Sequence, residues 1–261
     1  MKSRAKEGSL WDLFISQKDL RIARLPRIVV PGLPHHIVQR GNNRQAVFFA
    51  DADYRKYLEC LRLGTERYGC SVHAYVLMTN HVHLLVTPST EGGLARLMQS
   101  VGRRYVRYVN STYRRSGTLW DGRFRSALVD PAHYLFACMR YIELNPVRAD
   151  MVSTPGAYQW SSYAANAVGR DKDLITRHAQ YQLLGRYNNG QMSAYRALFN
   201  EALAPGVFTG IRKATEQGAI MGNDRFRRQI TATLKRRVEK FPHGGDRKSE
   251  AFRKHPLLRT A

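Results

Sequence analysis

Two histidines, His81 and His83, lie two residues apart within the apolar run 76–86. Side chains of a β-strand alternate between its faces, so both imidazoles are expected on one face, with Val82 and Leu84 pointing into the core. Two imidazoles at this spacing can hold one divalent transition-metal cation. The alternative, a chance pair of ordinary strand histidines, stays open, although burying imidazoles without partners is costly.

A second set of chemically capable residues lies in a predicted helix that begins at Pro131. This helix must end near Asn145, because Pro146 disfavours helical geometry in the residue before it. Tyr141 and Asn145 are four residues apart and therefore share a face of the last turn. A tyrosine hydroxyl beside a cation-bound phosphate could attack phosphorus and form a phosphotyrosine. The alternative for Tyr141 is an ordinary core or boundary position.

The charge balance indicates a polyanionic partner. The chain has 42 Lys and Arg against 20 Asp and Glu, a formal net charge of +22. An excess of this size favours nucleic acid, which is bound through phosphate contacts and counterion release. A basic protein of the membrane surface would be expected to carry a broad apolar face opposite its cations, and we find none in the sequence.

The sequence also predicts a cellular context. It contains no run of about 18 apolar residues and no secretory signal pattern. Its three cysteines form no CxxC pair, and an odd count argues against a disulfide framework. We therefore expect a cytoplasmic protein, nucleoid-associated when bound to DNA, with no membrane partner and no small-molecule substrate.

Arginines gather on one face of a predicted helix from 94 to 113, opposite its apolar face. A solvated basic face is the usual alternative, but the absence of interleaved acids favours phosphate binding. The arginines of this predicted DNA-contacting stripe, including one beside it and one just after the helix, are Arg96, Arg103, Arg104, Arg107 and Arg114.

A glycine-flanked turn follows at 117–125, with an aromatic residue on either side of Gly122. Trp120 and Phe124 could stack on unpaired bases while Arg123 and Arg125 hold the backbone. Both aromatic side chains could equally well be core anchors instead of stacking on bases.

The order of elements predicts an α+β fold. Strand-like segments are expected at 35–40, 71–77 and 81–86, with a helix at 54–68 after the first strand. The histidine pair is then expected on a central strand. His35, His36 and His73 are weaker candidates, interpreted as ordinary sheet or surface histidines.

The character of the sequence changes near residue 165. Helical stretches are expected at 192–202 and 208–219, followed by a basic segment and a flexible basic tail that contacts nucleic acid non-specifically. A solvated tail with no partner is the alternative. The predicted organisation is an N-terminal extension at 1–25, a catalytic domain at 26–164 and a basic helical region at 165–261.

Three segments together resemble a known family. The His81–His83 pair is similar to the HUH motif, and the segments 117–124 and 141–149 resemble those of REP-associated tyrosine transposases, which are single-tyrosine HUH transposases. The resemblance covers about 26–163, is weak for the C-terminal third and is absent for 1–24.

The resemblance implies a central antiparallel β-sheet flanked by helices, a ferredoxin-like or RRM-like core with a C-terminal helical appendage. It implies that Tyr141 is the nucleophile, giving a 5′-phosphotyrosine and a free 3′-OH. His81 and His83 would ligate Mg²⁺ or Mn²⁺, with Asn145 in the position from which relatives supply a third ligand, often a glutamine. The implied substrate is single-stranded DNA bearing a palindromic hairpin, and the implied assembly is a monomer or homodimer.

Two other functions remain compatible with these residues. One is a basic protein that recognises DNA or RNA hairpins on the same fold without cutting them. The other is metal-dependent hydrolysis with water as nucleophile, for which Tyr141 would be dispensable. An intact set of His81, His83 and Tyr141 favours the strand-cleaving and rejoining enzyme over the pure binder.

Overall fold

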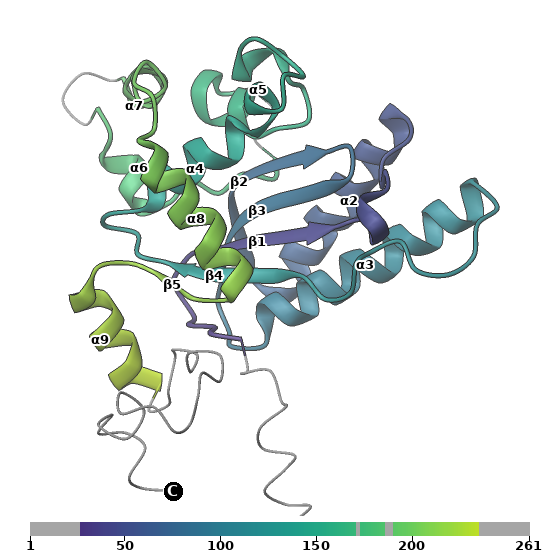
Figure 1. The fold of residues 1–261 in the computed structure, drawn as a ribbon, viewed down its shortest axis with the longest axis horizontal. Coiled ribbons are helices and arrows are strands. Elements are labelled where there is room, and N and C mark those ends of the chain that lie inside the picture. Colours follow the sequence, from purple (N-terminus) through teal and green to yellow (C-terminus); the bar gives the residue numbers. More distant parts are fainter. Residues whose placement is uncertain (1–26, 171–172, 186–189, 235–261) are drawn as a thin grey trace, which may run out of the picture. The chain divides into compact units, whose positions relative to one another are not determined.

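Five strands form one sheet in the order β2-β3-β1-β4-β5 (Figure 1). The structure is a computed structural model that describes residues 27–170, 173–185 and 190–234. Neighbouring strands run antiparallel except for β4 and β5, which are parallel. The predicted antiparallel sheet flanked by helices is thus confirmed, with one short parallel strand added. The strands are β1 (His35–Arg40), β2 (Cys70–Met78), β3 (His81–Pro88), β4 (Arg125–Val129) and β5 (Ile220–Met221).

The histidine pair lies on an internal strand, as predicted. Strands β2 and β3 form a hairpin whose register pairs Met78 with His81 and Val76 with His83. Strand β1 pairs with the other side of β3, placing Val38 opposite His83 and Arg40 opposite His81. Since β3 has a partner on each side, its backbone is fixed by two ladders.

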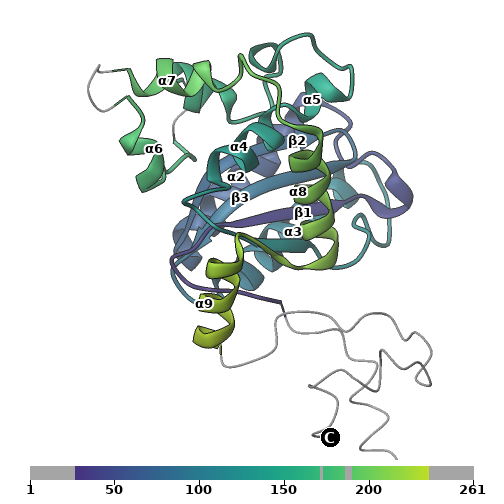
Figure 2. The same cartoon turned by 60° about the vertical axis from the view of Figure 1, so that its left-hand side comes forward.

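Helices cover both faces of the sheet (Figure 2). Helices α2 (Asp51–Tyr68) and α3 (Gly93–Thr112) pack on one face, and α4 (Leu135–Glu143) and α8 (Pro205–Gln217) lie on the other. The alternation of β3 divides its side chains between the two cores. Val82 and Leu84 pack with α2 and α3, whereas Leu85 packs with α4 and α8. The odd-numbered histidines therefore face α4 and α8.

The α2–α3 layer is held at its end by a buried carboxylate. Asp53 lies in the first turn of α2 and accepts hydrogen bonds from the backbone N–H groups of Phe49 and Ala50. The hydroxyls of Tyr108 and Tyr113 donate to the same carboxylate at 3.0 and 2.8 Å. A cap shared between helices fixes the position of α3 along α2. The predicted helices at 54–68 and 94–113 agree with these elements to within three residues.

The region after residue 144 adds short elements around the sheet. Its longer predicted helices correspond to α7 and α8, and α8 contacts α4, β4 and β1. The elements of this region are α5 (Asn145–Arg148), the 3-10 helix Pro155–Ala157, the π-helix Ala164–Val168, α6 (Ala179–Leu183), α7 (Gln191–Ala197), α8, β5 and α9 (Asp224–Leu234). All of them belong to one compact unit, Ile28–Glu239. The division at residue 164 stays a prediction, and the predicted N-terminal extension and basic tail lie outside the described residues.

Segments from this later region also cover the outer edge of β2. The N–H of Leu77 donates to the carbonyl of Trp160 at 2.9 Å, and the N–H of Ser162 donates to the carbonyl of Tyr75 at 2.9 Å. Further along the same edge, the N–H of Thr176 donates to the carbonyl of Val72 at 2.8 Å. Strand β5 covers the opposite edge of the sheet, at β4.

The three cysteines, Cys60, Cys70 and Cys138, are free and buried. Within the described parts of the chain, no helix combines the length and the apolar character needed to cross a bilayer.

Candidate active site around Tyr141 and the histidine pair

The rings of His81 and His83 lie side by side on the face of β3 that is covered by α4 and α8. Their centroids are 5.0 Å apart at an interplanar angle of 73°. His83 is buried and His81 is partly exposed. The alternation of the strand thus gives the shared face that the sequence predicted, with one ring open towards solvent.

The amide of Asn80 sets the tautomer of His81. Its Nδ2 donates to the carbonyl of Arg44 at 3.0 Å, which turns Oδ1 towards the imidazole. The Nδ1 of His81 lies 2.6 Å from this Oδ1. Since an amide oxygen only accepts, Nδ1 must carry the proton, and Nε2 keeps its lone pair for a ligand.

His83 has a partner that the sequence interpretation treated as an ordinary sheet histidine. Its Nδ1 lies 3.0 Å from Nε2 of His36 on β1, and the two ring planes are nearly parallel, at 9°, with centroids 5.2 Å apart. The other ring nitrogen of His36 lies 2.7 Å from Oγ1 of Thr215 on α8. His36 faces the pair because it is an even-numbered residue of β1, diagonal to His83 in the register.

The two other weak candidates make contacts elsewhere. Nε2 of His35 accepts from the backbone N–H of Val30, and His73 bonds the hydroxyl of Thr87 and a backbone carbonyl. Both therefore fit the interpretation as structural sheet histidines.

The histidines of the site are neutral at physiological pH. Burial lowers the pKa of His36 to about 3 and that of His81 to about 4, and burial lowers the pKa of His83 well below its usual value. The guanidinium of Arg40 adds to the lowering at His81 and His83. Neutral imidazoles are the form that binds metals.

Tyr141 on α4 is brought against the histidines. Its ring meets His36 edge-on at 5.5 Å between centroids and His83 at 5.7 Å. Phe208 of α8 packs against it at 5.6 Å, and the guanidinium of Arg148 lies 4.0 Å from the Phe208 ring centroid. Burial raises the pKa of Tyr141, and the charge of Arg148 opposes that rise. The hydroxyl of Tyr141 is therefore a buried group on which the charge of Arg148 acts against the effect of burial.

Asn145 begins α5, one turn after Tyr141. Its Nδ2 donates to the carbonyl of Tyr141 at 2.8 Å, so the amide nitrogen is committed to the helix and Oδ1 is the atom available as a ligand. Among the described residues, no group of three His, Cys, Asp or Glu side chains could hold a metal ion. The donor set that the sequence predicted, two imidazoles and an amide oxygen, has a chemistry compatible with Mg²⁺ or Mn²⁺.

Two arginines share the sheet face of the histidines. Directly opposite residues of an antiparallel pair point to the same face. Arg40 is opposite His81, and Arg125 of β4 is opposite Val38, which is itself opposite His83. Both arginines are exposed. The sequence prediction included Arg125 but missed Arg40, because only the strand register places Arg40 beside the pair.

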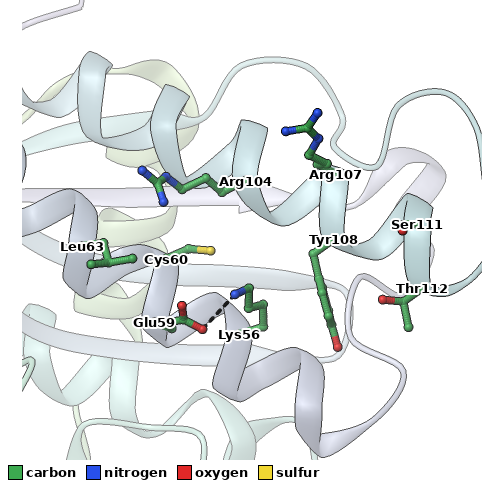
Figure 3. Close-up of a pocket in the computed structure, with 9 residues that line it drawn as sticks. All are labelled: Lys56, Glu59, Cys60, Leu63, Arg104, Arg107, Tyr108, Ser111 and Thr112. Carbon is green, nitrogen blue, oxygen red and sulfur yellow. Dashed lines mark hydrogen bonds and ion pairs between the residues drawn. The ribbon is translucent and has the colours of Figure 1, made fainter.

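The predicted arginine stripe lies on the other layer. Arg104 and Arg107 of α3 line a groove between α2 and α3, together with Lys56, whose ammonium pairs with Glu59 at 2.9 Å (Figure 3). The arginines Arg96, Arg103, Arg104, Arg107 and Arg114 are all exposed. Since α3 covers the face opposite the histidine pair, DNA bound there would lie on the other side of the sheet from the histidines.

The aromatic residues of the 117–125 turn are core residues. Trp120 is 5% exposed and Phe124 is 8% exposed, and both pack in the core beneath α2 and α3. The structure favours the core-anchor alternative for both, because a ring buried to this degree offers no face to a base. Arg123 is exposed in the same turn and is free of this constraint.

Glu143 is a further residue that the sequence interpretation missed. It lies two positions after Tyr141 and is fully buried. Its carboxylate accepts from Ser162 Oγ at 2.6 Å, from Asn166 Nδ2 at 2.9 Å and from the Tyr195 hydroxyl at 2.8 Å. Burial raises its pKa to about 7. The sequence feature that could have indicated Glu143 is that it is the single acidic residue of a largely apolar helix. Its hydrogen-bond partners lie 19 to 52 residues further along the chain.

The fold and the site together define an α+β protein in which a pair of histidines on the sheet faces a tyrosine on a helix. Residues 29–145, which are 117 of the 261 residues, match the family described as "Transposase IS200 like". The matched segment contains His36, His81, His83, Tyr141 and Asn145. The transposase resemblance predicted from the sequence is confirmed, and DNA transposition is the class of function that it supports.

Solved structures give more distant similarities. A REP-associated tyrosine transposase bound to a REP hairpin is 15% identical, with a TM-score of 0.49, over 59% of this chain and 89% of that one. A transposase candidate from Deinococcus radiodurans R1 is 21% identical, with a TM-score of 0.33, over 44% and 91%. A bacterial tRNA(His) guanylyltransferase-like protein in complex with ATP is 10% identical, with a TM-score of 0.34, over 54% and 67%. Among curated proteins, none matches this chain.

Proposed function

We propose that this protein is a metal-dependent enzyme that cleaves and rejoins single-stranded DNA at hairpin sequences through a 5′-phosphotyrosine on Tyr141. The observation that carries the proposal is the packing of the Tyr141 ring against both His36 and His83. A helix residue and a strand residue more than fifty positions apart meet at one point, and both are of types that phosphoryl transfer can use.

The histidines fit a divalent metal. Each presents an unprotonated Nε2 when Nδ1 carries the proton, which is the arrangement fixed at His81 by Asn80. His81, His83 and Oδ1 of Asn145 would hold Mg²⁺ or Mn²⁺. Such an ion, when bound, neutralises a phosphate oxygen and stabilises the charge that develops during displacement.

The reaction is balanced by an exchange of esters. The Tyr141 Oη attacks phosphorus, a bond from Oη to phosphorus forms, and the bond from phosphorus to the 3′ oxygen breaks. The tyrosine loses its proton and the departing 3′ oxygen gains one, so the DNA ends as a free 3′-OH and a 5′-phosphotyrosine. Rejoining is the reverse displacement by a 3′-OH, and no nucleotide cofactor is consumed because the ester bond is kept.

Cations around the tyrosine suit a phosphate substrate. Arg148 and Arg212 both oppose the burial-driven rise in the pKa of Tyr141. Arg40 is exposed beside His81 on the sheet face. A phosphate placed between the histidines and Tyr141 would therefore meet positive charge from the strand and from the helices.

The test uses a single-stranded hairpin oligonucleotide, taken from palindromes flanking the gene, labelled in separate samples at its 5′ or its 3′ end. With Mn²⁺, we expect an adduct that survives SDS and retains the 3′ label only, and peptide mapping should place the DNA remnant on Tyr141. Cleavage without adduct would indicate metal-activated water instead. Tight hairpin binding without cleavage in Mg²⁺ or Mn²⁺ would indicate a hairpin-binding module.

A second expected result concerns the arginines between α2 and α3. Replacing both Arg104 and Arg107 by glutamine should weaken hairpin binding. Both side chains are exposed, so both guanidiniums can reach the phosphate backbone of bound DNA. The slope of log affinity against log salt concentration should fall by about 1.8 if both contact duplex phosphates. Fluorescence anisotropy over a salt series measures this slope.

The matched control removes two other exposed arginines, Arg62 and Arg67 of α2, with the same change in net charge. An equal loss of slope in both double variants would assign the effect to the general field of the protein and contradict a specific contact at the groove.

A further inference from the structure

We propose that His36 and Thr215 are positioning residues that hold His83 in the tautomer able to bind the metal. This inference deepens the proposed function and rests on it for the assignment of His83 as a ligand. Thr215 belongs to α8, outside the segment that matches the transposase family. The site would then be completed by a hydroxyl from the later part of the chain.

The direction of the hydrogen-bond chain is fixed at its far end. Oγ1 of Thr215 lies 2.9 Å from the carbonyl oxygen of Ile211 and 2.7 Å from Nδ1 of His36. A carbonyl oxygen only accepts, so the single hydroxyl hydrogen must point to Ile211. If it pointed to His36 instead, two acceptor oxygens would face each other at 2.9 Å without a hydrogen.

The directions of the other two hydrogen bonds follow from the direction of the Thr215 hydroxyl. Oγ1 of Thr215 then accepts from His36, so Nδ1 of His36 carries the proton. A neutral imidazole has one N–H, which leaves Nε2 of His36 as an acceptor. At 3.0 Å from it, Nδ1 of His83 must donate, and the lone pair of His83 is left on Nε2.

The opposite direction would disable the ligand. If His36 carried its proton on Nε2, it would donate to Nδ1 of His83, and His83 would be protonated on Nε2, the atom proposed to bind the ion. The two tautomers of a free imidazole differ little in energy, so the partner of the second nitrogen decides between them. Outer partners of this kind commonly change metal affinity 10- to 100-fold when removed.

Burial holds the hydrogen bonds from Thr215 through His36 to His83 in one arrangement. His36 and Thr215 are 0% and 2% exposed, and His83 is 5% exposed, so water cannot readily replace a missing partner. The ring planes of His36 and His83 are nearly parallel, at 9°, which fits an in-plane N–H···N bond that also fixes the orientation of the ligand ring. The pair thus controls both the proton position and the aim of His83.

The decisive variant is Thr215→Val, which is nearly isosteric and replaces the hydroxyl with a methyl group, with Thr215→Ser as the matched control. Long-range ¹H–¹⁵N spectra of the imidazoles should show His83 protonated on Nδ1 in the wild type and in Thr215→Ser. In Thr215→Val, His36 loses its acceptor and a population of His83 protonated on Nε2 should appear.

Metal binding is measured separately, by Mn²⁺ titration with electron paramagnetic resonance in the absence of DNA. We expect the dissociation constant to rise at least about tenfold in Thr215→Val and to be restored in Thr215→Ser. His36→Phe keeps an aromatic ring but has no nitrogen, and a similar loss is expected. Thermal melts of each variant identify a change that comes from unfolding.

Two results would overturn the proposal. One is a wild-type His83 protonated on Nε2, which the spectra report without any metal. The other is an unchanged Mn²⁺ dissociation constant in a folded Thr215→Val. Neither depends on DNA cleavage, so failure of the proposed phosphotyrosine chemistry would be seen in the labelled-DNA assay and not here.

Discussion

Tyr141→Phe is expected to abolish both the covalent adduct and strand cleavage. The substitution removes only the hydroxyl, and the phenyl ring can keep its edge-on packing against His36 and His83. Loss of an essential nucleophile costs about 10⁴-fold or more in rate. Hairpin affinity should stay within about twofold of wild type, because the surface arginines are untouched. A denaturing gel with end-labelled hairpin DNA and Mn²⁺, together with an anisotropy titration, measures both quantities.

The matched control is Tyr134→Phe. Tyr134 is partly buried and caps the same helix, α4, so this variant loses an equivalent hydroxyl away from the histidines. It should form adduct at the wild-type rate. Cleavage that persists in Tyr141→Phe without an adduct would contradict the tyrosine mechanism and favour water as the nucleophile.

Glu143→Ala is expected to lower the free energy of unfolding by about 3 kcal/mol near pH 6, since buried donors would lose their shared acceptor. The hydroxyl of Tyr195 would lose its carboxylate partner, while Ser162 and Asn166 would keep only their backbone acceptors. These contacts join the tyrosine helix to the segment 162–166 and to α7. Urea unfolding followed by circular dichroism measures the loss.

Glu143→Gln provides the control and a pH signature. The pKa of Glu143 is raised by burial from 4.5 to about 7 in the folded state. Between these values the folded state holds more protons than the unfolded one, so this group's stabilisation is complete below about pH 4.5 and is lost as pH rises through about 7. The wild type should lose on the order of 3 kcal/mol over this window.

The glutamine variant keeps the shape without the charge, so this part of the pH dependence should disappear. Above pH 7 it should be at least as stable as the wild type, because it buries no ionised group. An equal pH slope in Glu143→Gln and wild type would show that Glu143 is not the group that titrates.

Local periodicity was enough to predict the elements that bear the site. Alternation places His81 and His83 on one face, and the proline after Asn145 marks the end of the tyrosine helix; both depend on residues close in sequence. The meeting of Tyr141 with the pair was predicted only through the family resemblance. The packing that brings α4 onto that face of the sheet involves residues far apart in the chain.

The partners of the site could not be predicted in the same way. His36 reaches His83 through the register of β1 on β3, and Thr215 arrives from a helix 179 residues beyond His36. Arg40 could not be predicted as a neighbour of His81 either, because only the register of β1 on β3 brings the two residues together. For Trp120 and Phe124, the surrounding glycines and arginines left base stacking and core anchoring as equal alternatives. The fold decides between them, because both rings are buried in the core beneath α2 and α3.

The later part of the chain covers the outer edge of β2 and pairs with β4 at the other side of the sheet, and this limits how two copies could associate. Open edge strands present unpaired N–H and C=O groups that invite pairing with another chain. Here Leu77, Tyr75 and Val72 of β2 already bond residues 160, 162 and 176, and β4 is covered by the two-residue strand β5. A homodimer that continued the sheet across two subunits would have to displace these segments. Association through helix faces leaves them in place.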